Sequence, residues 1–430
     1  MPPQNQSTST EKPLLAPNKI GEEVIRVDDK LYNAKVLADI HPGGELFVKV
    51  FAGLDATEAF ASYHRRKFPH KAMSDACIGN SVEEHPDAYM ADYFELCQKV
   101  ESVLPRHKSF APTGYFFKVF LIMACAFGLE FYIHLNSLYV WYLTAPLGFF
   151  MALIGLNIQH DANHGAVSRN PFINRMLGYS QNWIGGSSLD WIHQHVVLHH
   201  IHTNDVHEDP DIRGSSLLRM NPLKPLMSYQ TVQHIYVFLL IFLFGIVMVF
   251  SSLINILYGT NMTKMSTMVK KDRVVEAITS VVFMLRWFVC PMLQSPSWTT
   301  FWNISPLFIV GGYYLAFFFI ISHNFVGVYM FDNTKDRKST FLYDQVASSS
   351  NVGGAWLCML NGGLNYQIEH HLFPRIQHTH YPVIAPIVRQ FCKERNIPYV
   401  HFPTISGNFI SCVQHIAKMG SENIPINFGA

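Results

Sequence analysis

The sequence predicts a mainly α-helical integral membrane protein, in which a four-helix core carries a cap on its cytosolic side and follows a small α+β domain. Composition is the first observation behind this prediction: 49% of the 430 residues are hydrophobic and 15% are charged, whereas roughly 25% are charged in soluble domains. The second is four apolar stretches long enough to cross a hydrocarbon core about 30 Å thick. The third is the grouping of histidines just beyond those stretches. A net charge of +1 gives no sign of a nucleic-acid partner.

The amino-terminal residues 1–19 are polar, contain prolines and lack an apolar run, which predicts a disordered tail rather than a signal peptide. The amino end is therefore expected to stay in the cytosol. The seven cysteines are scattered and form no CxxC pair. This spacing indicates neither a disulfide framework nor a zinc ribbon.

Two histidines mark the next segment, residues 20–90. His41 begins the motif HPGG, whose glycines let the backbone approach a ligand closely, and His64 follows 23 residues later. Two histidines in this arrangement can face each other across a planar ligand. With the sequence GLDATEAF between them, the segment resembles the cytochrome b5 domain. That resemblance implies a small α+β fold and a haem b with His41 and His64 as its axial ligands.

Residues 91–110 are assigned as a linker, and residues 111–430 as the membrane domain. A fifth apolar stretch, 274–293, carries Glu276 and Arg286, which are costly in lipid, so it is interpreted as interfacial or re-entrant. The four predicted spans are residues 114–133, 138–158, 235–257 and 300–322.

An alternative assignment stays open, in which the fifth stretch spans the membrane and residues 235–257 only dip into it. The positive-inside tendency favours this alternative, because four basic residues lie between the two stretches: Lys264, Lys270, Lys271 and Arg273. Either assignment leaves two crossings before His160 and two more between His207 and His323. All the histidine clusters are therefore expected on the side of the amino end.

Three short motifs contain the candidate metal ligands: HDANHG at 160–165, HVVLHH at 195–200 and QIEHH at 367–371. Histidines four residues apart lie on one face of a helix and can bind one ion together. Imidazole suits iron, zinc and copper, and this number of ligands exceeds the four that one zinc ion takes. Two metal ions, and specifically two redox-active irons, are the simplest expectation. The candidates are His160, His164, His195, His199, His200, Gln367, His370 and His371.

His323 ends the last predicted span at the level of these motifs and is a further candidate ligand. Three histidines that flank the second motif are not expected to bind metal: His193, His202 and His207. They could instead orient ligands from outside, as could Asn204 and Asp209.

From residue 110 to the carboxyl end, the sequence resembles the front-end fatty acid desaturases that carry an amino-terminal cytochrome b5 domain. The motifs QHDANHGA, QHVVLHHIHTN, DPDIR and GGLNYQIEHHLFP carry the resemblance, and glutamine at the start of the third histidine motif is typical of that group. The resemblance implies that the candidate residues, with His323, bind a diiron centre. It also implies oxygen-dependent insertion of a double bond into a polyunsaturated acyl chain, with electrons delivered through the fused haem domain.

The same resemblance implies an NADH-dependent cytochrome b5 reductase as the electron donor. It further implies a multi-pass location in the endoplasmic reticulum membrane, with the histidine motifs and the amino-terminal domain facing the cytosol. The residues between the histidines resemble those of delta-5 and delta-4 enzymes more than those of the delta-6 type, and delta-5 on twenty-carbon chains is the preferred expectation. Delta-6, delta-4 and sphingolipid delta-8 desaturases stay open, as do a hydroxylase on the same scaffold and, in another class, a histidine-rich membrane receptor or transporter. The acyl carrier, coenzyme A or phospholipid, and the oligomeric state are not indicated.

Overall fold

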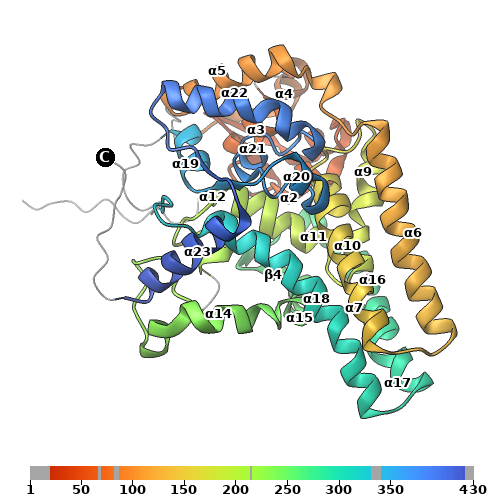
Figure 1. The fold of residues 1–430 in the computed structure, drawn as a ribbon. Helices are drawn as coiled ribbons and strands as arrows, with labels where there is room; N and C mark the ends of the chain where they lie inside the picture. Colours follow the sequence, from red (N-terminus) through yellow and green to blue (C-terminus); the bar gives the residue numbers. More distant parts are fainter. Residues whose placement is uncertain (1–19, 66–68, 82–86, 214–215, 331–339, 422–430) are drawn as a thin grey trace, which may run out of the picture.

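The computed structural model describes residues 20–65, 69–81, 87–213, 216–330 and 340–421. The predicted disordered tail, residues 1–19, lies outside the described residues. Long helices form one half of the molecule, and shorter helices from both ends of the chain form the other half, as Figure 1 shows. The described chain is mainly helical, as predicted.

A three-stranded antiparallel sheet and four short helices build the amino-terminal domain. The amide oxygen of Asn33 accepts hydrogen bonds from the backbone N–H groups of Lys35 and Val36, at 3.0 and 3.1 Å, and so caps the first helix directly after the second strand. The predicted α+β architecture is confirmed. In chain order the elements are β1 (Val24–Val27), β2 (Lys30–Asn33), α1 (Ala34–Ile40), α2 (Glu45–Val50), α3 (Thr57–His64), α4 (His70–Ala76) and β3 (Cys77–Asn80).

The segment assigned as a linker, residues 91–110, is mostly helical and packed. Residues 91–103 lie in α5 (Asp87–Val103), and the short 3-10 turn η1 (Arg106–Lys108) follows. Tyr93, Leu96 and Val100 are fully buried and share a hydrophobic core with residues near the carboxyl end of the chain. The segment connects the two domains along the chain, but its apolar face anchors it to the cap.

Four helical segments are long and apolar enough to cross a membrane in the part of the chain that the structure describes. Two of them are interrupted by a π-helical turn and then continue. The segments contain α6 (Thr113–Leu135); α7 (Trp141–Ile154), which continues through η2 (Gly155–Gln159) into α8 (His160–Asn163); α16 (Lys270–Met284), which continues through η6 (Leu285–Val289) into α17 (Cys290–Gln294); and α18 (Trp298–His323).

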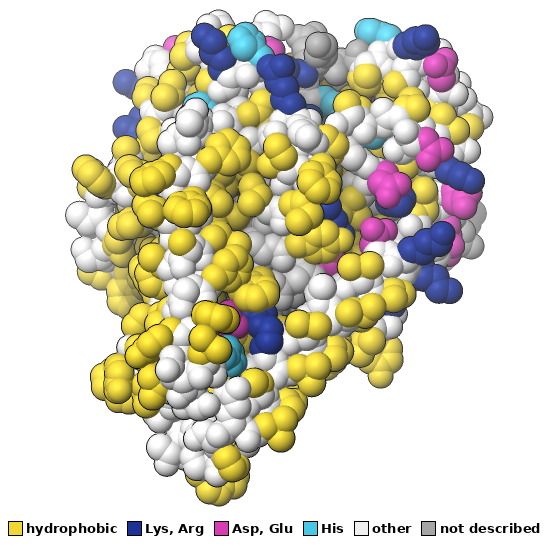
Figure 2. Space-filling model, turned by 90° about the vertical axis from the view of Figure 1, so that its right-hand side faces the viewer, with side chains coloured by type: hydrophobic (Ala, Val, Ile, Leu, Met, Phe, Trp, Pro, Cys, Tyr) yellow, Lys and Arg dark blue, Asp and Glu magenta, His cyan; other side chains and the backbone are white. Residues whose placement is uncertain are grey.

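Helices α7 and α18 cross in close contact. A Cβ atom on Gly148 would lie 2.4 Å from the carbonyl oxygen of Leu307, so only glycine permits this approach. Hydrophobic side chains cover the flank of the molecule on which α6 lies, as Figure 2 shows. An apolar flank of this extent suits contact with lipid rather than water.

The structure reverses the preferred assignment of the third span. Residues 235–257 do not form one straight helix, because α14 (Gln233–Ile241) and α15 (Phe244–Tyr258) meet at a bend of 79°. Residues 274–293 lie instead within one of the four long helical segments. The alternative considered for the sequence is the one that the structure supports.

Ion pairing accounts for the two charges that argued against the fifth stretch. Glu276 is buried and forms an ion pair of 3.1 Å with Arg175, with further hydrogen bonds from Asn182 and Ser187. Arg286 pairs with Glu130 of α6. Charges that are paired inside the protein do not have to face lipid, so hydropathy overstated their cost.

The cap is made of short elements that lie between the second and third long segments and after the fourth. Near the bend and the third long segment lie η4 (Ser228–Val232), β4 (Thr260–Asn261), β5 (Thr263–Lys264) and η5 (Thr267–Val269). The cap itself contains α9 (Pro171–Gly178), α10 (Ser180–Trp183), α11 (Ser188–Trp191), the π-helical η3 (Ile192–His199), α12 (His200–His202), α13 (Pro210–Arg213), α19 (Phe341–Ala347), β6 (Ser350–Val352), α20 (Ala355–Asn361), α21 (Gln367–Leu372), η7 (His378–His380), α22 (Tyr381–Glu394), β7 (Val400–Phe402) and α23 (Ile405–Met419).

Candidate haem pocket and metal centre

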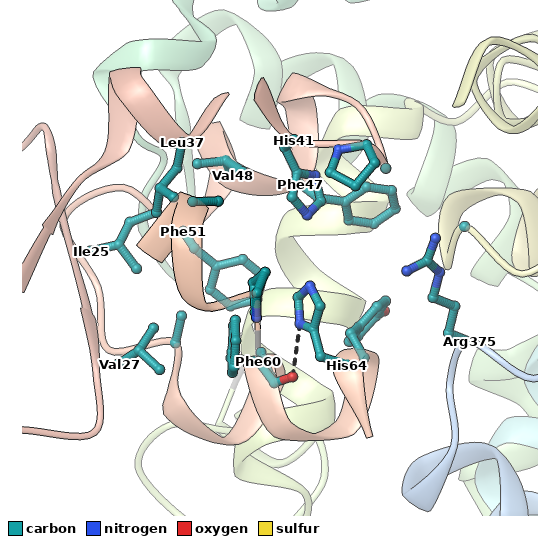
Figure 3. Close-up of a pocket in the computed structure, with 18 of the residues that line it drawn as sticks. Ile25, Val27, Leu37, His41, Phe47, Val48, Phe51, Phe60, His64 and Arg375 are labelled. Atoms are coloured by element: carbon teal, nitrogen blue, oxygen red, sulfur yellow. Dashed lines mark hydrogen bonds between the residues drawn. The ribbon is translucent and has the colours of Figure 1, made fainter. Parts of the chain in front are cut away.

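The amino-terminal domain contains a pocket with a histidine on each side. His41 follows α1 and His64 ends α3, and their ring centroids are 6.1 Å apart. Figure 3 shows the two rings facing each other across the pocket. Two metal–nitrogen bonds of about 2 Å, plus half a ring on either side, give a separation of about 6 Å. The pair is therefore spaced to hold one metal ion between the rings.

Hydrogen bonds orient both rings. The Nδ1 atom of His41 lies 2.9 Å from the carbonyl oxygen of Gly44, and Nδ1 of His64 lies 2.9 Å from the carbonyl oxygen of Phe60. Each Nδ1 thus donates its hydrogen to the backbone and leaves Nε2 as the metal-binding atom. Burial lowers the pKa of His41 and lowers that of His64 to about 3, so both imidazoles are neutral at physiological pH, as ligation requires.

The rest of the pocket is almost entirely apolar, and its empty volume is about 1110 Å³, which includes solvent space at its mouth. Apolar side chains from α1 to α4 line it, which fits a flat macrocycle between the two histidines. Arg375 is the one Lys or Arg among the lining residues that the structure describes, and it comes from the loop after α21, in the membrane domain. Figure 3 shows its side chain directed toward the pocket.

Nine residues predicted as metal ligands converge beneath the cap in two adjoining groups. In the first group, ring nitrogens of His160, His164, His195 and His370 all lie within 4.8 Å of one another. The Nε2 atom of His200 lies 3.2 Å from Nε2 of His195 and 3.0 Å from Nε2 of His370, which places it in the same group.

The second group contains His199, His323 and His371, whose ring nitrogens also lie within 4.8 Å of one another. The side-chain amide of Gln367 is 2.9 Å from Nε2 of His323 and 3.1 Å from Nε2 of His371. His199 and His200 are neighbours in sequence and lie in different groups. A π-helical turn ends at this point, and the widened helix lets the two rings diverge.

Residues outside the two groups form hydrogen bonds with five of the ring nitrogens that point away from the groups. These contacts fix the ring orientations, as the outer partners of metal-binding histidines do. The Nδ1 atoms lie 2.8 Å from the Tyr63 hydroxyl for His164, 3.1 Å from Asp209 for His199, 3.1 Å from the Ser348 carbonyl for His323, 3.2 Å from the Tyr381 hydroxyl for His370 and 3.0 Å from the Gln345 amide oxygen for His371.

The environment of the two groups suits metal ions. All nine side chains are buried, yet Nε2 of His160, Nε2 of His164, Nε2 of His199 and Oε1 of Gln367 have no hydrogen-bond partner among the described residues. Buried nitrogen and oxygen atoms without partners are costly unless something else satisfies them. The donor set therefore fits two metal ions with nitrogen-rich coordination.

Electrostatics differ between the groups. Burial lowers the pKa of His195, His200, His370 and His371 well below the ordinary value, which keeps these rings neutral. Burial also acts to lower the pKa of His199, but the carboxylates of its two aspartate neighbours raise it overall. A carboxylate behind an imidazole makes it a more basic ligand. The two neighbours are Asp209, at 3.1 Å, and Asp211, at 3.4 Å.

The flanking histidines that were not expected to bind metal lie in neither group. His193 contacts the hydroxyl of Thr263 at 3.1 Å. Asp209 has the orienting role proposed for it from the sequence, and Asn204 donates its backbone N–H to Asp209 at 2.7 Å. The sequence gives no sign that Tyr63, Gln345, Ser348 and Tyr381 contact the rings, because a tyrosine, glutamine or serine far along the chain carries no signal of its own.

Comparison with known proteins agrees with this site. Residues 135–403 match the family described as Fatty acid desaturase, a range that contains all nine residues of the two groups, and residues 11–82 match the Cytochrome b5-like Heme/Steroid binding domain. The first family uses a diiron centre and the second domain binds haem, so the chain carries both cofactors.

Three curated relatives cover most of this chain. An acyl-lipid (7-3)-desaturase of Diacronema lutheri is 41% identical, and one of Rebecca salina is 40% identical; each alignment covers 92% of this chain and 90% of the relative. An acyl-lipid (8-3)-desaturase of Physcomitrium patens is 31% identical over 91% of this chain and 87% of the relative. The chain belongs to the fatty acid desaturase family, as a multi-pass, front-end acyl-lipid desaturase with a fused cytochrome b5 domain.

Proposed function

We propose that the two histidine groups each hold one iron of the diiron centre. The first iron would be bound by His160, His164, His195, His200 and His370, and the second by His199, His323, His371 and Gln367. The observation that carries this proposal is the convergence of nine buried side chains into two groups. Ring nitrogens of seven of them lie within 4.8 Å of one another in their group, and His200 and Gln367 lie 2.9 to 3.2 Å from members of these groups. Loss of iron on substitution of a group member tests it.

Gln367 would bind through its amide oxygen. In the structure its amide nitrogen faces His323 and His371, while Oε1 has no partner among the described residues. An amide nitrogen donates hydrogen bonds and does not ligate metal, whereas an amide oxygen does. Rotation of the amide by 180° exchanges two atoms of nearly the same size, and that orientation is the one proposed for the iron-loaded protein.

When bound, the irons supply the oxidant, made from dioxygen, that removes hydrogen from an unactivated methylene. The chain's own residues bury the two groups and orient the rings of His164, His199, His323, His370 and His371, and burial would keep water from the reacting carbon. The haem domain would supply electrons one at a time, with His41 and His64 holding the haem and Arg375 placing a positive charge at the pocket. A cytochrome b5 reductase that uses NADH would reduce the haem.

We further propose that an apolar cavity between the long helices receives the acyl chain. Its empty volume is about 560 Å³, and α7, α15, α16 and α18 line it together with the loop after α10. Ala152 precedes His160 by eight residues, and Leu315 precedes His323 by eight. At 1.5 Å per helical residue, the cavity lies about 12 Å from the metal groups, toward the membrane. That distance suits the part of a long chain beyond the reacting carbons.

Filling the cavity is expected to change the preferred chain length. Ala152→Leu adds three carbons at a fully buried cavity wall. The added carbons would weaken the binding of the longest acyl chains first, by about 1 to 3 kcal/mol, because only those chains reach the crowded part of the cavity. The ratio of activity on twenty-two-carbon to twenty-carbon acyl chains should fall by about tenfold, measured by gas chromatography of the products. Ala124→Leu, the same change at an exposed position on α6, should leave the ratio unchanged; an unchanged ratio in Ala152→Leu as well would rule out this cavity.

We propose that the new double bond is placed as in the (7-3) relatives. In these names we read the first number as the carbon of the existing double bond and the second as the number of carbons counted from it toward the carboxyl group. The new double bond then starts at carbon 4 in a (7-3) enzyme and at carbon 5 in an (8-3) enzyme. The (7-3) relatives are 40 and 41% identical to this chain, against 31% for the (8-3) relative. Delta-4 is therefore favoured over the delta-5 position that the sequence motifs favoured, and delta-5 stays the second candidate.

A feeding experiment decides between the two positions. Yeast that express the chain are fed either a twenty-two-carbon acid with its first double bond at carbon 7 or a twenty-carbon acid with its first double bond at carbon 8. A delta-4 enzyme converts the first and a delta-5 enzyme the second, each to a product with one additional double bond. Conversion of neither acid, despite protein loaded with iron and haem, would contradict both positions.

We also propose the endoplasmic reticulum membrane as the location, with the cap and the haem domain facing the cytosol. The second long apolar segment ends inside the first histidine motif, at Asn163, and two more such segments lie between the second motif and the end of α18 at His323. An even number of crossings returns the chain to the same side each time. The haem domain and the metal groups must share one side, because they contact each other directly.

A further inference from the structure

The haem pocket and the first histidine group share a wall. His164 and Gly165 line the haem pocket, although both belong to the membrane domain. Gly165 has a φ of +67°, and a Cβ atom there would lie 3.4 Å from two ring carbons of Phe47. The backbone of the first histidine motif therefore lies against the haem domain, with no other element between them.

Tyr63 is the side chain that joins the two sites. It immediately precedes His64 at the end of α3, and its hydroxyl lies 2.8 Å from Nδ1 of His164. The rings of Tyr63 and His164 lie 6.4 Å apart at an angle of 30°. The covalent chain from His64 to Tyr63 and one hydrogen bond thus connect the candidate haem ligand to the candidate iron ligand.

The hydrogen bond has a defined direction when His164 binds metal. Its Nε2 atom has no partner among the described residues and is the atom left for iron. The hydrogen of a neutral imidazole then sits on Nδ1, so Nδ1–H donates to the Tyr63 hydroxyl oxygen.

We propose that Tyr63 is the bridge by which each electron passes from the haem domain to the diiron centre; this rests on the proposed role of His164 as an iron ligand. In each transfer a ferrous haem becomes ferric, and one ferric iron becomes ferrous. No bond of Tyr63 breaks and no proton leaves it, so the residue is unchanged after each transfer. Two such transfers supply the two electrons that each double bond requires.

The substitution Tyr63→Phe tests the bridge, because it keeps the aromatic ring and removes only the hydroxyl. Tyr89→Phe is the matched control. The Tyr89 hydroxyl also joins the two parts of the molecule, from α5 to Glu58 of α3 at 2.8 Å, but it contacts none of the candidate ligands. A role in domain docking alone predicts similar effects of the two variants.

The measurement is the rate of haem reoxidation in the full-length, detergent-solubilised protein. Catalytic amounts of a soluble cytochrome b5 reductase with limiting NADH reduce the haem without oxygen. A pulse of oxygen with the polyunsaturated acyl substrate follows, and absorbance reports the ferrous haem. The iron-depleted variant His199→Ala gives the background rate of haem oxidation by oxygen. Haem and iron contents of every preparation are measured. The His199→Ala rate is expressed per haem, and the other rates are expressed per molecule that holds both cofactors.

The expected result is reoxidation slower by about tenfold to a hundredfold in Tyr63→Phe, the range seen when an outer partner of a metal ligand is removed. Tyr89→Phe should match the unsubstituted protein, with haem and iron contents unchanged in both variants. An equal rate per loaded molecule in Tyr63→Phe and the unsubstituted protein would overturn the bridge and leave the iron ligands in place. If the unsubstituted protein were no faster than His199→Ala, the proposed iron ligands and the bridge would both fail.

Discussion

Substituting His199 with alanine is expected to abolish desaturation and to lower the iron content of the purified protein. His199 lies in the second histidine group, and the carboxylate of Asp209 orients its ring at 3.1 Å. Loss of an outer partner of a metal ligand costs about 10- to 100-fold in affinity or activity, so loss of the ligand itself should exceed the upper value. Product analysis by gas chromatography and iron analysis by mass spectrometry measure the two effects.

His193→Ala is the matched control for this prediction. His193 is buried in the same π-helical segment, but it contacts Thr263 and lies in neither histidine group. It should retain iron and activity within a few-fold. Equal loss of iron from both variants would mean that His199 supports the fold of the segment rather than the metal.

The second large effect is expected for His64→Ala, which removes one side of the haem pocket. The variant should lose the haem absorbance, because one of the two rings spaced 6.1 Å apart would be missing. Desaturation driven by NADH should fall by about a hundredfold, the advantage that a tethered partner gains over a free one. Iron content should stay normal, because His64 lies in neither histidine group.

His70→Ala is the control for the haem domain. His70 is an exposed residue at the start of α4, a few residues beyond His64, and its substitution should leave haem and activity unchanged. Retention of haem by His64→Ala, with unaltered absorbance, is the result that would rule out His64 as an axial ligand. Loss of iron together with haem would indicate that the two sites do not assemble independently.

The choice of the third membrane span is where the structure differs most from the sequence-based expectation. Hydropathy located every long apolar stretch but preferred residues 235–257 over 274–293 as the third span. It treats Glu276 and Arg286 as if both side chains faced lipid without a partner. In the structure, Arg175 and Glu130 pair with these residues. The partners lie about 100 and 156 positions away along the chain. A hydropathy window of about 19 residues cannot detect ion pairs between residues so far apart in the sequence.

Helix periodicity also explained only part of the metal site. The spacing of four residues paired His160 with His164 correctly, in one group. The same spacing pairs His195 with His199, yet the structure places these two in different groups, because the segment is π-helical and departs from 3.6 residues per turn. A regular helix was the expectation, and only the folded backbone shows the departure.

The sequence by itself determined that the chain crosses a membrane, that two histidines of a small amino-terminal domain face each other, and that nine residues in a few motifs gather near one side of the membrane. Those properties depend on residue type and local spacing, which the sequence states directly. The tertiary structure alone decided which histidines share a group, which residues orient their rings, and that Tyr63 contacts His164. The two residues are 101 positions apart, and their contact exists only because the domains pack together, a property that no local pattern encodes.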